Sequence, residues 1–176
     1  MKILVADDES MIRMGLRSML RELGHVAILA KNGQDALRKS LAENPDLAIL
    51  DIQMPKTNGL QLAKALNKHQ PMPIIFLTAY SQDELVDQAT SLNVQGYLLK
   101  PTTSAELKVA ISVAVKRFRD LDRAEKQLSA RKEIDRAKAL LIARGLSEQA
   151  AFSQIQQEAR SSNRSMDAVA REILGE

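Results

Sequence analysis

Up to Pro101, short aliphatic runs alternate with longer stretches in which apolar side chains recur every three to four residues. The short runs are typical of strands buried on both faces, and they predict five strands at residues 3–6, 26–30, 47–50, 74–77 and 97–99. The helical spacing lies between them, at residues 11–20, 36–41, 62–66 and 85–92. This repeated strand–helix unit favours an α/β fold with a flavodoxin-like, five-stranded parallel sheet and helices on both faces.

The pattern changes after Pro101, because residues 102–144 contain neither glycine nor proline. Ser104 can cap a helix that continues to Gly145, a rod of about 60 Å. Its apolar positions alternate by fours and threes, as in a coiled coil with one interruption at Glu125: Leu107, Ile111, Ala114, Phe118, Leu121 and Leu128. For residues 104–116 the alternative is that they form the last helix of the α/β domain. Beyond Phe118 a free rod needs a partner.

Two short helices are predicted after Gly145, capped by Ser147 and Ser165. Together with the end of the rod they share an apolar face: Ile134, Ala137, Leu141, Leu146, Phe152, Ile155, Ala159, Met166, Val169, Ala170, Ile173 and Leu174. This cluster is small and depends on the rod for stability. We therefore predict two domains, residues 1–116 and residues 117–176.

Composition excludes several classes of protein and of site. The 176 residues are 45% hydrophobic and 27% charged, which indicates a folded chain rather than a disordered, collagen-like or membrane-spanning one. With no cysteine and two histidines, any metal is expected on oxygen ligands. The apolar run at residues 1–6 is too short for a signal peptide, so we expect a cytoplasmic protein. The net charge of +3 permits binding to a polyanion without indicating it.

Polar residues follow four of the predicted strands, at the edge where ligands bind in open parallel sheets. They are Asp7 and Asp8, Asp51, Thr78 and Lys100. Three converging carboxylates would repel one another unless a cation is bound, and their hard oxygens suit Mg²⁺. Lys100 would be a second cation, and the Thr78 hydroxyl could donate to a phosphoryl oxygen. The set fits phosphoryl transfer to a carboxylate.

Each of these residues also has an explanation without function. Asp7 and Asp8 could cap the following helix, Asp51 could start a turn, and Lys100 could be solvated. Four successive strand ends that carry an acid pair, an acid, a hydroxyl and a lysine are hard to obtain by chance, so the combination favours a site.

Four short segments resemble the receiver domain of bacterial response regulators: Val5-Ala6-Asp7-Asp8-Glu9, Leu50-Asp51-Ile52-Gln53-Met54-Pro55, Leu77-Thr78-Ala79 and Lys100-Pro101. The resemblance covers residues 1 to about 116. It implies that Asp51 accepts phosphate from a histidine kinase, and that Asp7, Asp8, Asp51 and the Gln53 carbonyl hold Mg²⁺. It also implies that Thr78 and Tyr97 form a switch pair and that the Lys100–Pro101 bond is cis.

Two positions bear on the limits of this resemblance. Thr102 stands where the family often has phenylalanine, which puts the packing of the following helix in question. A phosphatase or phosphotransferase with an aspartyl-phosphate intermediate would normally have an acid two residues after the nucleophile, and here that residue is Gln53. We therefore predict that the chain is not an enzyme.

The tail is similar to the ANTAR domain, an RNA-binding module of transcription antitermination regulators. The similarity covers roughly residues 117–176 and rests on Ile134–Ala143, Gly145-Leu146-Ser147-Glu148, Ala151-Phe152, Ile155, Ala159, Asn163 and Val169-Ala170. Ala139 replaces a glycine that is frequent in the family, which favours helix. The candidate RNA contacts are Lys132, Arg136, Lys138, Arg144, Arg160, Asn163 and Arg164. The two aromatic residues, Phe118 and Phe152, are expected on apolar faces, so no base-stacking platform is predicted.

Together these patterns predict a response regulator that a histidine kinase phosphorylates and that binds RNA hairpins in nascent transcripts as a homodimer, without contact to a membrane. Two alternatives keep the receiver. In one the tail is a DNA-binding helix-turn-helix, although residues 166–174 are short and largely apolar for a recognition helix. In the other the chain is a phosphorelay or protein-interaction module.

Overall fold

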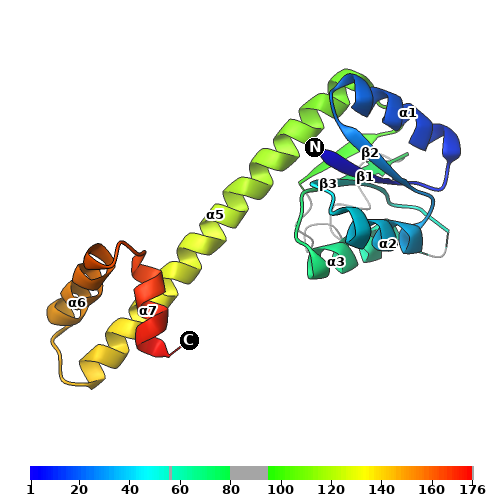
Figure 1. The fold of residues 1–176 in the computed structure, drawn as a ribbon. Coiled ribbons are helices and arrows are strands. Elements are labelled where there is room, and N and C mark those ends of the chain that lie inside the picture. The colour runs from blue at the N-terminus through cyan, green and yellow to red at the C-terminus, as the bar shows by residue number, and fades with distance from the viewer. Residues whose placement is uncertain (56, 80–94, 176) are drawn as a thin grey trace. The chain divides into compact units, whose positions relative to one another are not determined.

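The computed structural model describes residues 1–55, 57–79 and 95–175. Its elements are β1 (Lys2–Ala6), α1 (Ser10–Glu22), β2 (Val26–Ala30), α2 (Gly33–Glu43), β3 (Leu47–Asp51), α3 (Gly59–His69), β4 (Ile74–Thr78), β5 (Gly96–Leu99), α5 (Ser104–Ala143), α6 (Glu148–Ser161) and α7 (Met166–Leu174) (Figure 1). All five predicted strands are present. The helix predicted at residues 85–92 lies outside the described residues. Contacts divide the chain into two units, Met1–Arg119 and Asp120–Glu176.

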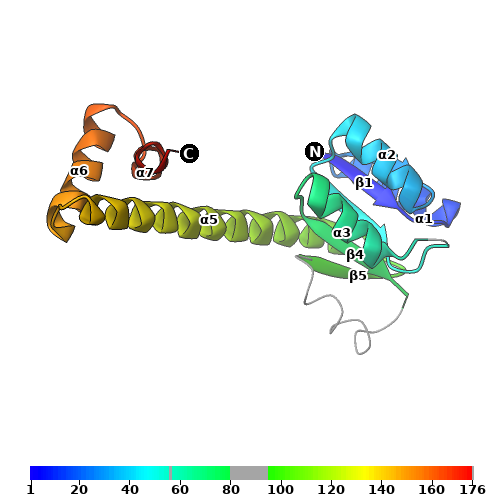
Figure 2. The same ribbon diagram turned by 90° about the horizontal axis from the view of Figure 1, so that it is seen from below.

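The first unit is a parallel sheet with the strand order β2-β1-β3-β4-β5. Alternate residues of each strand enter two separate cores. Leu4, Leu50 and Phe76 pack with α2 and α3 on one face, whereas Val5 and Ile49 pack with α1 and the first part of α5 on the other (Figure 2). Burial on both faces explains why the strands read as continuous aliphatic runs. The predicted flavodoxin-like α/β fold is confirmed.

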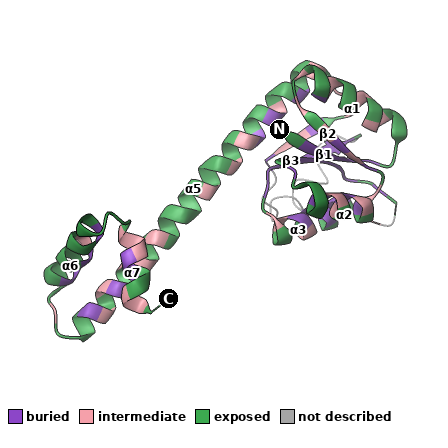
Figure 3. Cartoon of the chain, viewed as in Figure 1, coloured by how far each residue is buried: buried purple, intermediate pink, exposed green. Residues whose placement is uncertain are grey.

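The first part of α5 belongs to this core. Leu107, Ile111 and Ala114 are buried in the cluster beneath the sheet, so for this stretch the correct interpretation is the last helix of the α/β domain and not a coiled-coil seam. The later seam residues Leu121 and Leu128 are 47% and 55% exposed. Residues 119–132 include no buried position, which Figure 3 shows as a green and pink stretch of α5.

The start of α5 differs in detail from the prediction. The cap is Thr103 and not Ser104: the Thr103 main-chain N–H donates to Glu106 at 2.8 Å, and the Glu106 N–H donates to the Thr103 hydroxyl at 3.3 Å. This reciprocal pair is a capping box. The Thr102 hydroxyl also lies 3.4 Å from Glu106. Because Leu107 is fully buried, threonine at position 102 does not prevent α5 from packing on the sheet.

The second unit contains the end of α5 with α6 and α7. Ala137, Ala151, Ile155, Val169 and Ala170 form its buried centre. Ser147 caps α6 by accepting from the Ala150 N–H, as predicted. Ser165 stands at the cap position of α7 but makes no side-chain cap bond. Phe152, which was expected in the core, is 42% exposed, because Ala151 and Ile155 supply the buried face of α6.

Within the described residues, no helix is long and apolar enough to cross a membrane.

Candidate functional site

The three predicted aspartates lie together at the carboxyl ends of neighbouring strands. Asp7 and Asp8 follow β1, and Asp51 is the last residue of β3, which pairs with β1 in the sheet. Each offers a carboxylate oxygen within 4.8 Å of the others. Asp7 is fully buried and Asp51 is 6% exposed, whereas Asp8 is exposed. The cluster is thus open to solvent at Asp8 and closed beneath it.

Lys100, which follows β5, reaches into this cluster. Its Nζ lies 2.8 Å from Asp7 Oδ2, 3.1 Å from Asp51 Oδ2 and 3.4 Å from Glu9 Oε1. Burial lowers the pKa of Lys100, but the carboxylates of Asp7 and Asp51 beside its ammonium outweigh this effect, so the pKa is raised. Lys100 therefore remains charged, and the solvated-lysine interpretation is wrong. The Lys100–Pro101 bond is cis, as the family resemblance implied.

In each of the two buried aspartates, Asp7 and Asp51, one carboxylate oxygen accepts the main-chain N–H of the residue two positions further along. Asp7 Oδ1 accepts the Glu9 N–H at 2.8 Å, and Asp51 Oδ1 accepts the Gln53 N–H at 3.3 Å. These short side-chain to main-chain bonds fix each side chain and leave its Oδ2 for Lys100. The cap residue of α1 is Glu9, which makes no side-chain cap bond, so helix capping does not explain the two acids.

The donor set fits a divalent cation. Asp7 Oδ2 is buried, and within the described part of the chain it accepts no hydrogen bond of good geometry, although Lys100 lies at ion-pair distance. Burial raises the pKa of Asp51, and the hydrogen bond from Lys100 only partly opposes this, so the ionised carboxylate is disfavoured. A cation at three carboxylates relieves that cost, and carboxylate and main-chain oxygens are what Mg²⁺ prefers. Asp7, Asp8, Asp51 and the Gln53 carbonyl are the groups that could hold it.

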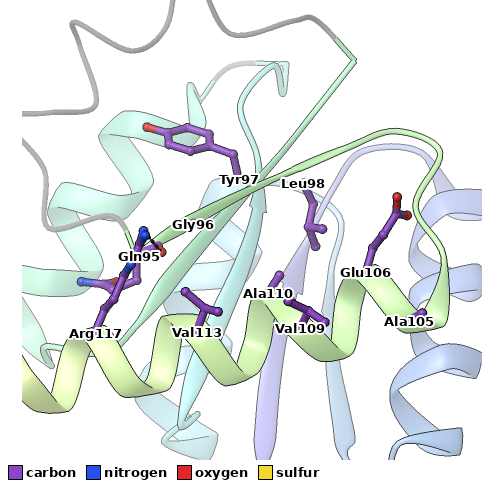
Figure 4. A pocket seen from close by; sticks show the side chains of 10 residues that line it. All are labelled: Gln95, Gly96, Tyr97, Leu98, Ala105, Glu106, Val109, Ala110, Val113 and Arg117. Carbon is purple, nitrogen blue, oxygen red and sulfur yellow. Dashed lines mark hydrogen bonds between the residues drawn. The ribbon is translucent and has the colours of Figure 1, made fainter.

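The switch candidates Thr78 and Tyr97 stand on the adjacent strands β4 and β5. Thr78, at the end of β4, is 6% exposed, and Tyr97 is opposite Phe76 with ring centres 5.9 Å apart. A groove of about 590 Å³ lies between β5 and the first part of α5. Figure 4 shows the side chains that line it. The Tyr97 ring points away from α5, whereas Leu98 points towards it. Tyr97 therefore packs on the same face of the sheet as Phe76, in the core formed with α2 and α3.

The sequence analysis did not identify Gly59, the glycine that lets α3 lie close to the phosphoacceptor candidate Asp51. Gly59 begins α3, and its N–H donates to the Ile52 carbonyl at 2.9 Å. A Cβ at this position would stand 2.2 Å from the Asp51 carbonyl oxygen and 2.9 Å from Ile52 Cα. Only glycine lets α3 lie directly on the main chain that carries Asp51.

The basic candidates of the second unit fall into two groups. Lys138 pairs with Glu148 at 3.0 Å, and Arg164 pairs with Glu172 at 2.6 Å and donates to the Ala168 carbonyl. These contacts tie α5 to α6, and the loop after α6 to α7. Exposure does not separate the candidates, because Arg164 is exposed, as are Lys132, Arg136, Arg144 and Arg160.

Asn163 has a conformational role of its own. It follows α6 with φ of +52°, in the left-handed region that asparagine tolerates better than most residues. The next residue, Arg164, donates its N–H to the Ala159 carbonyl and so closes the end of the helix. The helix end alone thus accounts for asparagine at this position, which stays a candidate RNA contact.

Comparisons with known proteins agree with both halves of the chain. Residues 3–112 match the response regulator receiver domain, and residues 122–174 match the ANTAR domain. The chain therefore belongs to the response regulators that join a receiver to an ANTAR domain.

Relatives support the same assignment. The chain is similar to the transcriptional regulatory protein PdtaR of Mycobacterium tuberculosis, with 37% identity over 182 residues that cover 98% of this chain and 89% of PdtaR. Its first unit is similar to the response regulator TrrA of Thermotoga maritima, solved in complex with Mg²⁺ and BeF. That structure shows 38% identity and a TM-score of 0.57, over 63% of this chain and 96% of TrrA. This protein is a two-component response regulator with a role in transcriptional regulation, in a family of regulators rather than enzymes.

Proposed function

We propose that a histidine kinase phosphorylates Asp51 in the cytoplasm and that the chain then controls transcription antitermination by binding RNA hairpins. In the transfer, a carboxylate oxygen of Asp51 bonds to phosphorus while the bond from phosphorus to the imidazole nitrogen of the kinase breaks. The observation that carries this proposal is the convergence of Asp7, Asp8 and Asp51 around the Lys100 ammonium at one edge of the sheet.

Each residue of the site has a defined task in this reaction. Asp51 is the nucleophile, held through Oδ1 by the Gln53 N–H. Lys100 lies 3.1 Å from Asp51 Oδ2, where it attracts the oxygens of the incoming phosphoryl group. Bound Mg²⁺, held by Asp7, Asp8, Asp51 and the Gln53 carbonyl, would neutralise the negative charge of that group. Thr78 would donate its hydroxyl to a phosphoryl oxygen and so draw the end of β4 towards the site.

The response to phosphorylation is carried by Thr78 and Tyr97. Tyr97 lies on β5, the strand that borders both β4 and the groove above α5. Its ring is only partly buried, so an inward turn would bury more of its surface when Thr78 moves. Such a turn would change the surface at β5, so phosphorylation of Asp51 would alter the shape of that surface.

RNA binding is supported by the ANTAR match and by the exposed basic residues of the second unit. Lys132, Arg144 and Arg160 are exposed and could make phosphate contacts. Lys138 and Arg164 would first have to give up their partners Glu148 and Glu172. We therefore expect Lys132, Arg144 and Arg160 to contribute more to affinity than Lys138 and Arg164.

The test measures phosphorylation and RNA binding together on the full chain and on Asp51→Asn. Acetyl phosphate with Mg²⁺ serves as donor, and intact mass reports the added phosphoryl group. Binding is measured to an RNA with two tandem hairpins and to duplex DNA of equal length at matched salt. The native chain is expected to be phosphorylated and then to bind the RNA more tightly than the DNA. After the same treatment, Asp51→Asn is expected to carry no phosphoryl group and not to bind the RNA more tightly than the DNA. Tighter binding to DNA, or RNA affinity that is independent of phosphorylation, would contradict the proposal.

We also propose that α5 forms a homodimer through its exposed middle. Residues 119–132 have no buried position in the single chain, yet Leu121 and Leu128 lie on the same face of the helix, seven residues apart. A dimer carries two ANTAR modules and would bind paired hairpins more tightly than one module, because the second contact becomes intramolecular. Sedimentation with and without beryllofluoride is expected to show a dimer in the activated state that Leu121→Asp abolishes. A monomer in both states would remove this part of the proposal.

A further inference from the structure

An arginine on α1 is tied to the backbone of the acidic site. Arg13 is the fourth residue of α1, and its Nη1 donates to the Asp7 carbonyl and to the Asp8 carbonyl, each at 2.8 Å. Both bonds end on main-chain oxygens, so they use none of the carboxylate oxygens. The positive charge of Arg13 thus lies next to the acidic loop, and the carboxylate oxygens of Asp7 and Asp8 stay available as metal ligands.

These bonds complete the attachment of the loop that follows β1. On one side the Asp7 N–H donates to the Ala30 carbonyl at the end of β2. Within the loop the Glu9 N–H donates to Asp7 Oδ1, and the Arg13 N–H donates to the Glu9 carbonyl. Apart from Arg13, no described side chain outside this loop donates a hydrogen bond to the carbonyls of Asp7 and Asp8. The Arg13 side chain thus ties the main-chain carbonyls of Asp7 and Asp8 to α1.

We propose that Arg13 is a positioning residue for the divalent cation: it holds the main chain of Asp7 and Asp8 so that both carboxylates are ready for Mg²⁺. This inference rests on the proposed Mg²⁺ site and goes beyond it, because Arg13 touches neither the cation nor the phosphoryl group. Groups that orient metal ligands typically change metal affinity by about 10- to 100-fold when they are removed. The affinity for Mg²⁺ should therefore depend on Arg13, whereas the transfer step at saturating Mg²⁺ should not.

The test compares Arg13→Gln with Arg13→Lys and with Arg17→Gln, which removes an exposed arginine one turn further along α1. Calorimetric titration of the full chain measures the dissociation constant for Mg²⁺, and phosphorylation by acetyl phosphate is followed across Mg²⁺ concentrations. Arg13→Gln is expected to weaken Mg²⁺ binding about tenfold. It should raise the half-maximal Mg²⁺ concentration equally and leave the saturated rate unchanged. Arg13→Lys, which keeps the charge and one donor group, should recover part of the loss, and Arg17→Gln should match the native chain.

Two results would overturn the inference: an Mg²⁺ dissociation constant for Arg13→Gln equal to the native value, or a fall in the saturated rate with an unchanged half-maximal Mg²⁺ concentration. Thermal unfolding without metal identifies a variant that has lost its fold, and in that case Arg13→Lys provides the comparison. If the native chain binds Mg²⁺ but takes no phosphoryl group, the proposed function fails, while the calorimetric result still decides the role of Arg13.

Discussion

Replacing Asp51 by asparagine is expected to make the metal-free chain more stable at pH 7, although it removes the proposed phosphoacceptor. Burial raises the pKa of Asp51, so the ionised carboxylate is less favourable in the folded chain than in the unfolded one. Asparagine has nearly the same volume and carries no charge. Removing one partner of a buried ion pair costs stability where the other charge is left uncompensated. Lys100 keeps Asp7 and Glu9 as partners in the variant.

The sign of the pH dependence follows from the direction of the pKa shift. Because the folded pKa of Asp51 lies above the unfolded one, the destabilisation is complete above the folded pKa and is relieved as the pH falls through it. The advantage of Asp51→Asn should therefore shrink towards about pH 4, near the ordinary pKa of aspartate. Urea unfolding in a chelator, at pH 7 and in steps below it, measures this difference. A variant that is less stable than the native chain at pH 7 would contradict the expectation.

Mg²⁺ should reduce or reverse the difference in stability between the native chain and Asp51→Asn. A ligand present at 100 times its dissociation constant stabilises the folded state by about 2.7 kcal/mol. The native chain has three carboxylates for the ion, whereas Asp51→Asn has two, so the native chain should gain more. The same carboxylate thus costs stability in the empty site and supplies binding energy in the filled one, which is a common property of functional sites.

The acidic cluster could be predicted from the strand pattern alone. Once residues 3–6, 47–50 and 74–77 are assigned to parallel strands, their carboxyl ends must meet at one edge of the sheet, and Asp7, Asp51 and Thr78 follow directly. No detail of side-chain packing is needed for that step. The strand order found in the structure, with β3 between β1 and β4, brings these ends side by side.

Features that depend on three-dimensional contacts could not be predicted in this way. Arg13 falls within the helical spacing of α1, where an arginine is usually a solvated surface residue, and only the structure brings its guanidinium to the two carbonyls. The apolar seam of α5 gave an ambiguous signal, because the same period fits a coiled coil and a helix that packs on a sheet. Burial separates the two, since Ile111 is 3% exposed and Leu128 is 55% exposed. Phe152 was misplaced because an apolar periodicity does not show which of two neighbouring side chains fills a small core.

Gly59→Ala is expected to damage both the fold of the first unit and its site. The added Cβ would stand 2.2 Å from the Asp51 carbonyl oxygen, and a main-chain atom cannot turn aside as a flexible side chain can. Overpacking of this kind costs about 1–3 kcal/mol. The start of α3 or the end of β3 must then shift, and a displacement of about 1 Å can lower a reaction rate about 100-fold. Urea unfolding and the rate of phosphorylation by acetyl phosphate at saturating Mg²⁺ measure the two effects.

Gly15→Ala is the matched control, because it adds the same methyl group to the same unit in a different setting. Gly15 lies within α1, and its Cβ would meet no atom within 4 Å. Alanine in the interior of a helix is favoured over glycine by up to about 1 kcal/mol, so this variant should be more stable than the native chain and phosphorylated at the native rate. If Gly59→Ala instead behaved like Gly15→Ala, the close approach of α3 to Asp51 would not be needed to hold the phosphoacceptor. A stability loss with a native rate would restrict the role of Gly59 to folding, because the helix would then have moved away without displacing the carboxylate.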